Sequence, residues 1–284
     1  MRNLIPFLRG LSIFETVFGS VADLYDYVNR PRRNILEVLY DFRHTTPNIP
    51  LEYLFDLIPP IRPRAFSISS SPSAHAGKIQ LLVAVVSYKT KLLVKERLGL
   101  CSNFLANCAP GTLVPIWVRT GTMDFGLDKD TGELRGLTIC VGPGTGIAPF
   151  RSFVSEYAHR QHSKEESAKI LVFFGCRNRE KDLYFRDEWK DLQERCGGGL
   201  RFFAAFSREQ EDKEYVQHVV RREASLVAQF VRDGARVYIA GNAKQMPDQV
   251  TQEIARASGK RGEEADKFVE EMIRLKRLQM DTWS

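Results

Sequence analysis

The spacing of apolar residues changes along the chain and divides it into three regions. In residues 1–60 apolar side chains recur at helical intervals, which predicts a small helical segment. Pro31 precedes one of these apolar runs, as expected because proline is well tolerated at a helix start. The predicted helices cover residues 14–29, 32–42 and 51–57.

The second region, residues 61–135, alternates apolar and polar side chains over short β-branched runs, a pattern typical of strands. A short helical pattern over residues 101–107 interrupts it. Together these elements predict an antiparallel barrel. Closure of such a barrel needs about six strands and the pattern supplies three, so the predicted barrel is incomplete. The three predicted strands cover residues 64–70, 79–88 and 113–120.

The third region, residues 136–284, alternates strands with helices. This order predicts a doubly wound parallel sheet covered by helices, with a ligand site beyond the carboxyl ends of the strands. The predicted strands cover residues 137–141, 170–175, 200–205 and 236–240. The predicted helices cover residues 149–160, 183–196, 215–230, 246–259 and 263–279.

Composition and charge favour a phosphate-binding globular protein and argue against a nucleic-acid partner, a metal site and a membrane span. The 284 residues suffice for about two domains, and the net charge of +6 suits phosphate ligands. No basic motif with interleaved aromatic residues accompanies this charge, so we expect no nucleic-acid partner. The five cysteines form no CxxC pair, which favours reduced thiols in a cytoplasmic protein without a metal site. Pro6, Arg9 and Glu15 interrupt the apolar N-terminal run, so no membrane span is expected.

A glycine-rich loop follows the first strand of the third region. Gly142, Gly144 and Gly146 lie between this strand and a helix that begins near Pro149. Glycine lets the backbone approach a pyrophosphate closely, and the first turn of a helix presents free N–H groups to it. The loop therefore indicates either a dinucleotide site or an ordinary strand-to-helix turn.

A polar loop follows the third strand of the same region, at the edge where ligands bind. Its serine hydroxyl, guanidinium, ammonium and phenol groups can together bind the 2′-phosphate of NADPH. A solvated loop before a helix is the alternative. The four side chains belong to Ser207, Arg208, Lys213 and Tyr215.

Four motifs in this region resemble the cytochrome P450 reductase-like diflavin enzymes: GPGTGIAPFRSF, FFGCRNREKDLYFRDEW, AFSREQEDKEYVQHVV and VYIAGNAKQMPDQV. The resemblance covers residues 137–284 and implies a ferredoxin reductase-like NADP domain. It implies that Thr145 contacts the nicotinamide nucleotide and that Ser207 and Arg208 hold the 2′-phosphate. Gln249 stands where the family has an acid. The resemblance also places in this pocket Lys213, Glu214, Tyr215, Val216 and Gln217.

A second motif, Arg64-Ala65-Phe66-Ser67, stands where the family has Arg-x-Tyr-Ser. The resemblance implies that Arg64 binds the FAD pyrophosphate, that Phe66 covers the isoalloxazine ring and that Ser67 reaches flavin N5. Phenylalanine in place of tyrosine keeps the stacking but removes a phenolic hydrogen bond. Without the resemblance, the segment is an alternating strand.

Further FAD contacts follow from the same resemblance. Arg32 matches an arginine that reaches FAD, although a solvated basic patch around Pro31 is the alternative. A second pyrophosphate loop is implied at Gly99, Leu100, Cys101 and Ser102. The strand that borders the flavin is implied at Leu82, Val83 and Ala84.

The end of the chain also resembles the family. Trp283 is implied to stack on the flavin and to move aside before nicotinamide enters, and Asp281 is implied to belong to a polar relay. Ser67, Asp281 and Trp283 are thus the implied catalytic residues. Ala240 stands where many relatives carry a cysteine near the nicotinamide.

Taken together, these features predict an NADPH-dependent flavoprotein oxidoreductase that transfers a hydride from NADPH to FAD. The resemblance is strongest to the cytosolic NADPH-dependent diflavin oxidoreductase subgroup. It implies onward transfer through an FMN module, absent from this chain, to an anamorsin-like iron–sulfur protein in iron–sulfur cluster assembly. The alternative is a flavin-poor, non-catalytic fragment that binds NADPH or a partner. A plant-type ferredoxin–NADP reductase would not need the helical region before Arg64.

Overall fold

The chain is described by a computed structural model at residues 20–89, 96–128, 130–131, 133–160 and 169–283. Its contacts group it into two compact units. The first unit comprises Met1–Ala65 and Val85–Thr112, and the second comprises Phe66–Ala84 and Leu113–Ser284. The domain boundaries predicted near residues 60 and 135 stay predictions.

The first unit is mainly helical, as predicted. Ser20 caps its first described helix, and a reciprocal capping box between Asn34 and Glu37 starts the helix over Ile35–Asp41. The prediction for residues 14–19 lies outside the described residues, and residues 25–29 form a π-helix. The helices are α3 (Val21–Leu24), η1 (Tyr25–Asn29), α4 (Ile35–Asp41), η2 (Thr46–Asn48) and α5 (Leu51–Leu57). Their small core is made of Leu24, Val28, Val38 and Leu57.

The first unit also contains a short hairpin and a helix. Strand β1 (Ser87–Tyr88) pairs antiparallel with β2 (Arg97–Leu98), and helix α6 (Leu100–Asn107) follows directly. Gly99 packs tightly against this hairpin, because a Cβ atom at this position would lie 2.7 Å from Val86 Cβ. Helix α6 confirms the helix predicted over residues 101–107.

The strands predicted over residues 64–70 and 113–120 are not strands in the structure. In the first segment only an isolated bridge joins Ile68 to Leu81, and the second has no strand among the described residues. A strand needs a hydrogen-bonded neighbour and a surface to cover. Leu113 is 95% exposed and Trp117 is 59% exposed, so no described element covers the second segment.

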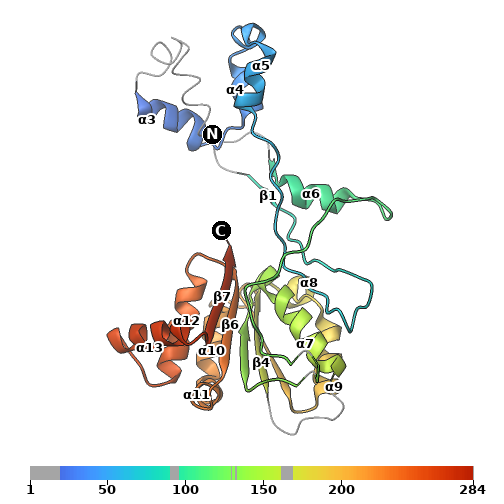
Figure 1. Cartoon of the computed structure of the whole chain (residues 1–284). Coiled ribbons are helices and arrows are strands. Elements are labelled where there is room, and N and C mark those ends of the chain that lie inside the picture. Colours follow the sequence, from blue (N-terminus) through green and yellow to red (C-terminus); the bar gives the residue numbers. More distant parts are fainter. Residues whose placement is uncertain (1–19, 90–95, 129, 132, 161–168, 284) are drawn as a thin grey trace. The chain divides into compact units, whose positions relative to one another are not determined.

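The second unit is built around a five-stranded parallel sheet, as predicted from the alternation of strands and helices (Figure 1). Its strand order is β5-β4-β3-β6-β7, and every neighbouring pair runs parallel. The strands are β3 (Thr138–Val141), β4 (Ile170–Cys176), β5 (Leu200–Phe206), β6 (Arg236–Asn242) and β7 (Leu278–Trp283).

The fifth strand, β7, was not predicted. The helix expected to reach residue 279 ends at Arg274, and the left-handed backbone of Lys276 (φ 55°) reverses the chain. Leu278–Trp283 contains few β-branched residues, so the local pattern does not favour a strand. Pairing with β6 decides its conformation, with Asp281 opposite Ala240.

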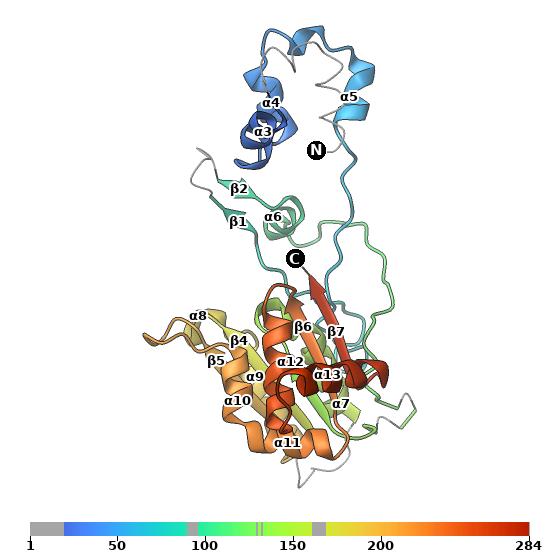
Figure 2. The ribbon, with the colours of Figure 1, turned by 90° about the vertical axis from the view of Figure 1, so that its left-hand side faces the viewer.

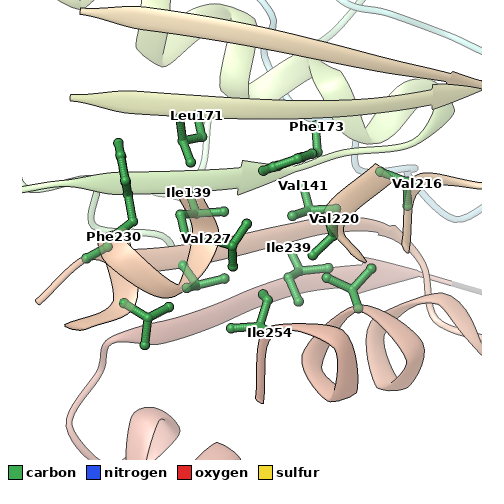
Figure 3. Close-up of a cluster of buried hydrophobic side chains, with 14 of the residues drawn as sticks. Ile139, Val141, Leu171, Phe173, Val216, Val220, Val227, Phe230, Ile239 and Ile254 are labelled. Atoms are coloured by element: carbon green, nitrogen blue, oxygen red, sulfur yellow. The ribbon is translucent and has the colours of Figure 1, made fainter. Parts of the chain in front are cut away.

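Helices cover both faces of the sheet. Alternate strand residues face opposite sides, so Ile139 and Val141 join one core while Cys140 joins the other. Figure 2 shows α12 and α13 in front of the sheet, and Figure 3 shows the buried side chains that join it to this layer. On this face lie α10 (Val216–Arg222), α11 (Ala224–Arg232), α12 (Met246–Ala257) and α13 (Glu263–Arg274). On the other face lie α7 (Ala148–Arg160) and α9 (Arg186–Cys196).

The loop after β3 packs directly against β6. A Cβ atom at Gly146 would lie 2.1 Å from the carbonyl oxygen of Ala240 and 2.7 Å from its carbonyl carbon. Only glycine fits at this distance, because both neighbours are backbone atoms of a central strand. The close packing of this loop on β6 therefore requires Gly146.

We expect Gly146→Ala to lower the free energy of unfolding by about 3 kcal/mol, because the added methyl group forces the loop away from β6. Gly121→Ala is the matched control, since a Cβ atom there meets nothing within 4 Å and its change should be below about 0.5 kcal/mol. Urea unfolding of both variants measures the difference. Equal effects at the two positions would contradict the packing argument.

Candidate nucleotide-binding site

The candidate site lies where the strand order changes direction. From β3 the chain first adds β4 and β5 on one side, and later adds β6 and β7 on the other side. In open parallel sheets the crevice beyond the carboxyl ends at this point is the usual ligand site. A cavity of about 670 Å³ lies there, lined by residues that follow β3, β4 and β5 and by the first turns of α10 and α12.

The first wall of this cavity is the glycine-rich loop. Gly144 has φ 57°, in the left-handed region that favours glycine, and opens the 3-10 turn η3 (Gly144–Ile147). This turn runs directly into α7, and Thr145 lines the cavity. A Cβ atom at Gly142 would lie 2.5 Å from the Gly146 carbonyl oxygen. The loop therefore brings its backbone and a helix start to the cavity, an arrangement that suits a pyrophosphate.

The second wall joins the ends of β4 and β5. The backbone N–H groups of Ser207 and Arg208 donate to the carbonyl oxygens of Cys176 and Arg177, each at 2.9 Å. The Ser207 hydroxyl lies 3.2 Å from the Cys176 carbonyl oxygen. Ser207 and Arg177 line the cavity, whereas Arg208 is exposed outside its lining.

Two arginines near this second wall, Arg179 and Arg208, differ in whether they form a salt bridge. Arg179 stacks on the Phe206 ring, 4.2 Å from its centroid, and pairs with Glu209 at 3.8 Å. Among the residues that the structure describes, no carboxylate forms a salt bridge with Arg208. The Arg208 guanidinium is therefore available to an anion at the end of β5.

The third wall comes from α10 and α12. The Gln217 amide nitrogen donates to the Gln249 side-chain oxygen at 2.8 Å and joins the two helices at the cavity. Tyr215 precedes α10 and is partly exposed, with its ring edge-on to His218 at 5.8 Å between centroids. Glu214 pairs with Arg222 at 2.7 Å. An exposed aromatic ring beside amide groups suits a nucleotide base.

Burial controls the ionisation of the groups near β4. Burial raises the pKa of the Cys176 thiol to about 12, and the Asp182 and Glu209 carboxylates act in the same direction. Burial also raises the pKa of Tyr184, with a further contribution from Asp182. Both side chains are therefore neutral at physiological pH, and Cys176 is not a reactive thiolate.

The structure brings together many of the predicted nucleotide residues. Arg208 and Lys213 do not line the cavity, although both adjoin it in sequence. The predicted nucleotide residues that line it are Thr145, Ser207, Glu214, Tyr215, Val216, Gln217 and Gln249, and Ala84, predicted to border the flavin, also lines it. Sequence reasoning missed Arg177, Asp182, Tyr184, Gln245 and Met246. Arg177 had a recognisable signal, because it directly follows a buried strand at the same sheet edge.

Asp281 and Trp283 lie on β7, at the carboxyl edge of the same sheet. Trp283 is paired with Asn242, and its carbonyl oxygen accepts from the Ala243 N–H at 2.8 Å. Its side chain is exposed, and neither residue lines the cavity. The proposed roles of Trp283 and Asp281 therefore stay predictions.

The predicted FAD residues are divided between the two units. The first unit contains Arg32, Arg64, Ala65 and the run Gly99, Leu100, Cys101 and Ser102, whereas the second contains Phe66, Ser67, Leu82, Val83 and Ala84. Their roles stay predictions. Within the first unit, Arg32 lies over the Tyr88 ring, 5.5 Å from its centroid. The Ser102 hydroxyl accepts from the Val86 N–H at 3.0 Å.

The described residues contain no cluster of three or more His, Cys, Asp or Glu side chains that could hold a metal ion. No helix in this part of the chain is long and apolar enough to cross a bilayer.

Two family models match this chain, one in each half of the sequence. A family model described as an oxidoreductase NAD-binding domain matches residues 140–252, and one described as an FAD binding domain matches residues 19–104. The loop of the nucleotide cavity thus falls inside the first match, and Arg32 and Gly99 fall inside the second.

Three curated relatives are each called NADPH-dependent diflavin oxidoreductase 1. The Xenopus laevis protein is 48% identical over 96% of this chain, the Mus musculus protein 44% over 92%, and the Arabidopsis thaliana protein 40% over 92%. These matches cover 44%, 43% and 42% of the respective relatives, so the chain spans less than half of their length. On this similarity, the chain belongs to the NADPH-dependent diflavin oxidoreductase family.

Proposed function

We propose that this chain is the FAD- and NADPH-binding portion of an NADPH-dependent oxidoreductase. The observation that carries the proposal is the glycine loop at the switch point of the parallel sheet, which forms one wall of a cavity of about 670 Å³. When bound, NADPH supplies a hydride that FAD accepts and passes on as single electrons. The protein's task is then to bind the two cofactors and orient them.

On the nucleotide side, the backbone from Gly144 to Gly146 binds the pyrophosphate, and Thr145 contacts the nicotinamide nucleotide. Ser207 and Arg208 hold the 2′-phosphate, with help from Lys213. Arg208 supplies a planar, forked set of donors that matches phosphate geometry. Its exposure and its lack of a salt-bridge partner among the described residues support this role.

On the flavin side, Arg64 and Arg32 bind the FAD pyrophosphate together with the loop that begins at Gly99. Phe66 covers the isoalloxazine ring, and Ser67 donates a hydrogen bond to flavin N5. Asp281 stabilises charge near the transfer, and Trp283 excludes nicotinamide until it moves aside. The match of residues 19–104 to an FAD-binding model supports the flavin assignment.

The proposal extends to the longer proteins in which this portion occurs. The word diflavin in the relatives' names supports a second flavin, FMN, outside this chain. We propose that electrons pass through that flavin to an anamorsin-like iron–sulfur protein in the cytoplasm, during iron–sulfur cluster assembly. One-electron acceptors of this kind match the single-electron chemistry of flavins.

A second candidate function is a flavin-poor fragment that binds NADPH or a partner without catalysis. The exposed segment around Leu113 and Trp117 favours this alternative, because a complete flavin barrel would cover apolar residues of this kind. The two candidates differ in one property, the retention of FAD.

Flavin retention and activity are measured on the purified chain. We expect visible flavin absorbance, and NADPH-dependent reduction of ferricyanide at a rate proportional to the flavin content. Colourless protein that still binds NADP⁺ would favour the second candidate. Protein that binds neither flavin nor NADP⁺ would contradict both.

The 2′-phosphate assignment predicts a cofactor-specific effect of Arg208→Ala. We expect the KM for NADPH to rise at least about tenfold, because a charge-assisted hydrogen bond contributes about 1.5–3 kcal/mol. The KM for NADH should change little. Arg201→Ala, at the other end of β5, is the matched control. Equal increases for NADPH and NADH in the Arg208 variant would refute the assignment.

The proposed role of Trp283 in excluding nicotinamide predicts that Trp283→Ala improves the use of NADH. Stacking of an aromatic ring contributes about 1 kcal/mol, and nicotinamide has to displace the Trp283 ring before it reaches the flavin. Removal of the ring should therefore raise kcat/KM for NADH roughly fivefold. Trp283→Phe keeps a ring and serves as the control. Steady-state kinetics with both nucleotides measure the preference, and an unchanged ratio in the alanine variant would rule out this role.

A further inference from the structure

A segment from the predicted flavin side is held to the nucleotide domain by charged and polar contacts. Residues 69–80, here called the anchored segment, belong to the second unit together with α7 and α9. Ser152 on α7 donates to the Ser70 carbonyl oxygen at 2.7 Å. One turn later, Glu156 accepts hydrogen bonds from the hydroxyl groups of Ser71 (2.6 Å) and Ser73 (2.7 Å). Helix α7 therefore binds this segment at several successive positions.

Arg151, also on α7, makes the largest set of these contacts and has only 4% of its surface exposed. Its Nη1 donates to the Ser69 carbonyl oxygen and to the Gln80 side-chain oxygen, each at 2.7 Å. Its Nη2 faces His75 Nε2 at 3.2 Å. One guanidinium group thus contacts the beginning, the middle and the end of the anchored segment.

The remaining donors of Arg151 bind α9. Its Nε lies 2.9 Å from both carboxylate oxygens of Glu188, and its Nη2 lies 2.8 Å from Glu188 Oε2. The Phe185 ring lies 4.2 Å from the guanidinium carbon, although Phe185 itself has a left-handed backbone with φ 61°. A buried cation is stable only when its donors are satisfied. Here four of the five guanidinium N–H groups have carboxylate, amide or carbonyl acceptors, which a lysine with three donors could not reproduce.

The ionisation of Glu156 agrees with a tightly held segment. Burial alone raises the pKa of this carboxyl group, but hydrogen bonds from Ser71, Ser73 and Arg160 outweigh burial and lower the pKa to about 2. Glu156 is therefore a charged acceptor at neutral pH. Its hydrogen bonds to the segment are of the stronger, charge-assisted kind.

Helix α7 connects this anchor to the nucleotide loop. The helix begins immediately after η3, so Thr145 precedes Arg151 by one to two helical turns of the same continuous element. At the other end, Ser67 lies two residues before Ser69, whose carbonyl oxygen Arg151 binds. Arg151 is therefore a short, rigid link between the two residues proposed to face the two cofactors.

We propose that Arg151 is a positioning residue that fixes Ser67 relative to the Thr145 loop, and so sets the alignment of the two cofactors. This inference rests on the proposed NADPH-to-FAD reaction. Reaction rates are sensitive to displacements of about 1 Å between reacting groups, so a loosened anchor lowers kcat without weakening nucleotide binding.

The test compares Arg151→Lys with Arg186→Lys, a matched change of an exposed arginine that pairs with Glu180. We expect amide hydrogen exchange over residues 68–81 to become about tenfold faster in the Arg151 variant, since lysine cannot keep all the hydrogen bonds that Arg151 makes to this segment. Affinity for NADP⁺ should stay within about twofold. Flavin reduction at saturating NADPH should slow about tenfold with little change in KM. The Arg186 variant should match the original protein in all three measurements.

A second variant separates the loss of this contact from misfolding of the Arg151 variant. Gln80→Ala removes one acceptor of Arg151 from the anchored segment and should produce the same changes at smaller size. Unchanged exchange and unchanged flavin reduction in both variants would overturn the proposal. Faster exchange throughout the second unit, with weaker NADP⁺ binding, would show a general structural role and also overturn it. If the original protein holds no flavin, the proposed function fails, while the exchange and NADP⁺ measurements still test the anchor.

Discussion

The nucleotide site depends on the close approach of one loop to one strand. Gly146 packs on the Ala240 carbonyl group so tightly that no side chain fits between them. This contact lets the chain leave β3, turn within η3 and begin α7 above the end of β6. The η3 turn and the residues at the ends of β4 and β5 then line a single cavity. A bulkier loop would separate the helix start from the strand ends.

Much of the parallel sheet could be predicted from the sequence, because its strands are short apolar runs buried on both faces. Ile139, Cys140 and Val141 read as a strand whichever face they cover. The glycine loop was equally visible, since its spacing follows from local geometry. Strand β7 was not visible, because Leu278–Trp283 becomes a strand only through pairing with β6.

The predicted barrel strand and the contacts of Arg151 show the same limit of prediction from sequence. Residues 113–120 have a strand-like pattern, yet pattern alone supplies no neighbour to pair with, and Leu113 stays exposed. Arg151 reads as an ordinary helical arginine in the sequence. Its partners Ser69, Gln80 and Glu188 are far from it along the chain, so only the folded structure reveals the buried network.

The most direct measurement is a crystal structure of this chain bound to NADP⁺. The account predicts electron density for the pyrophosphate against the backbone of Gly144–Ile147, with the 2′-phosphate beside Ser207 and Arg208. Density for the nucleotide on another surface, with the cavity between β3, β4 and β5 filled only by solvent, would contradict it.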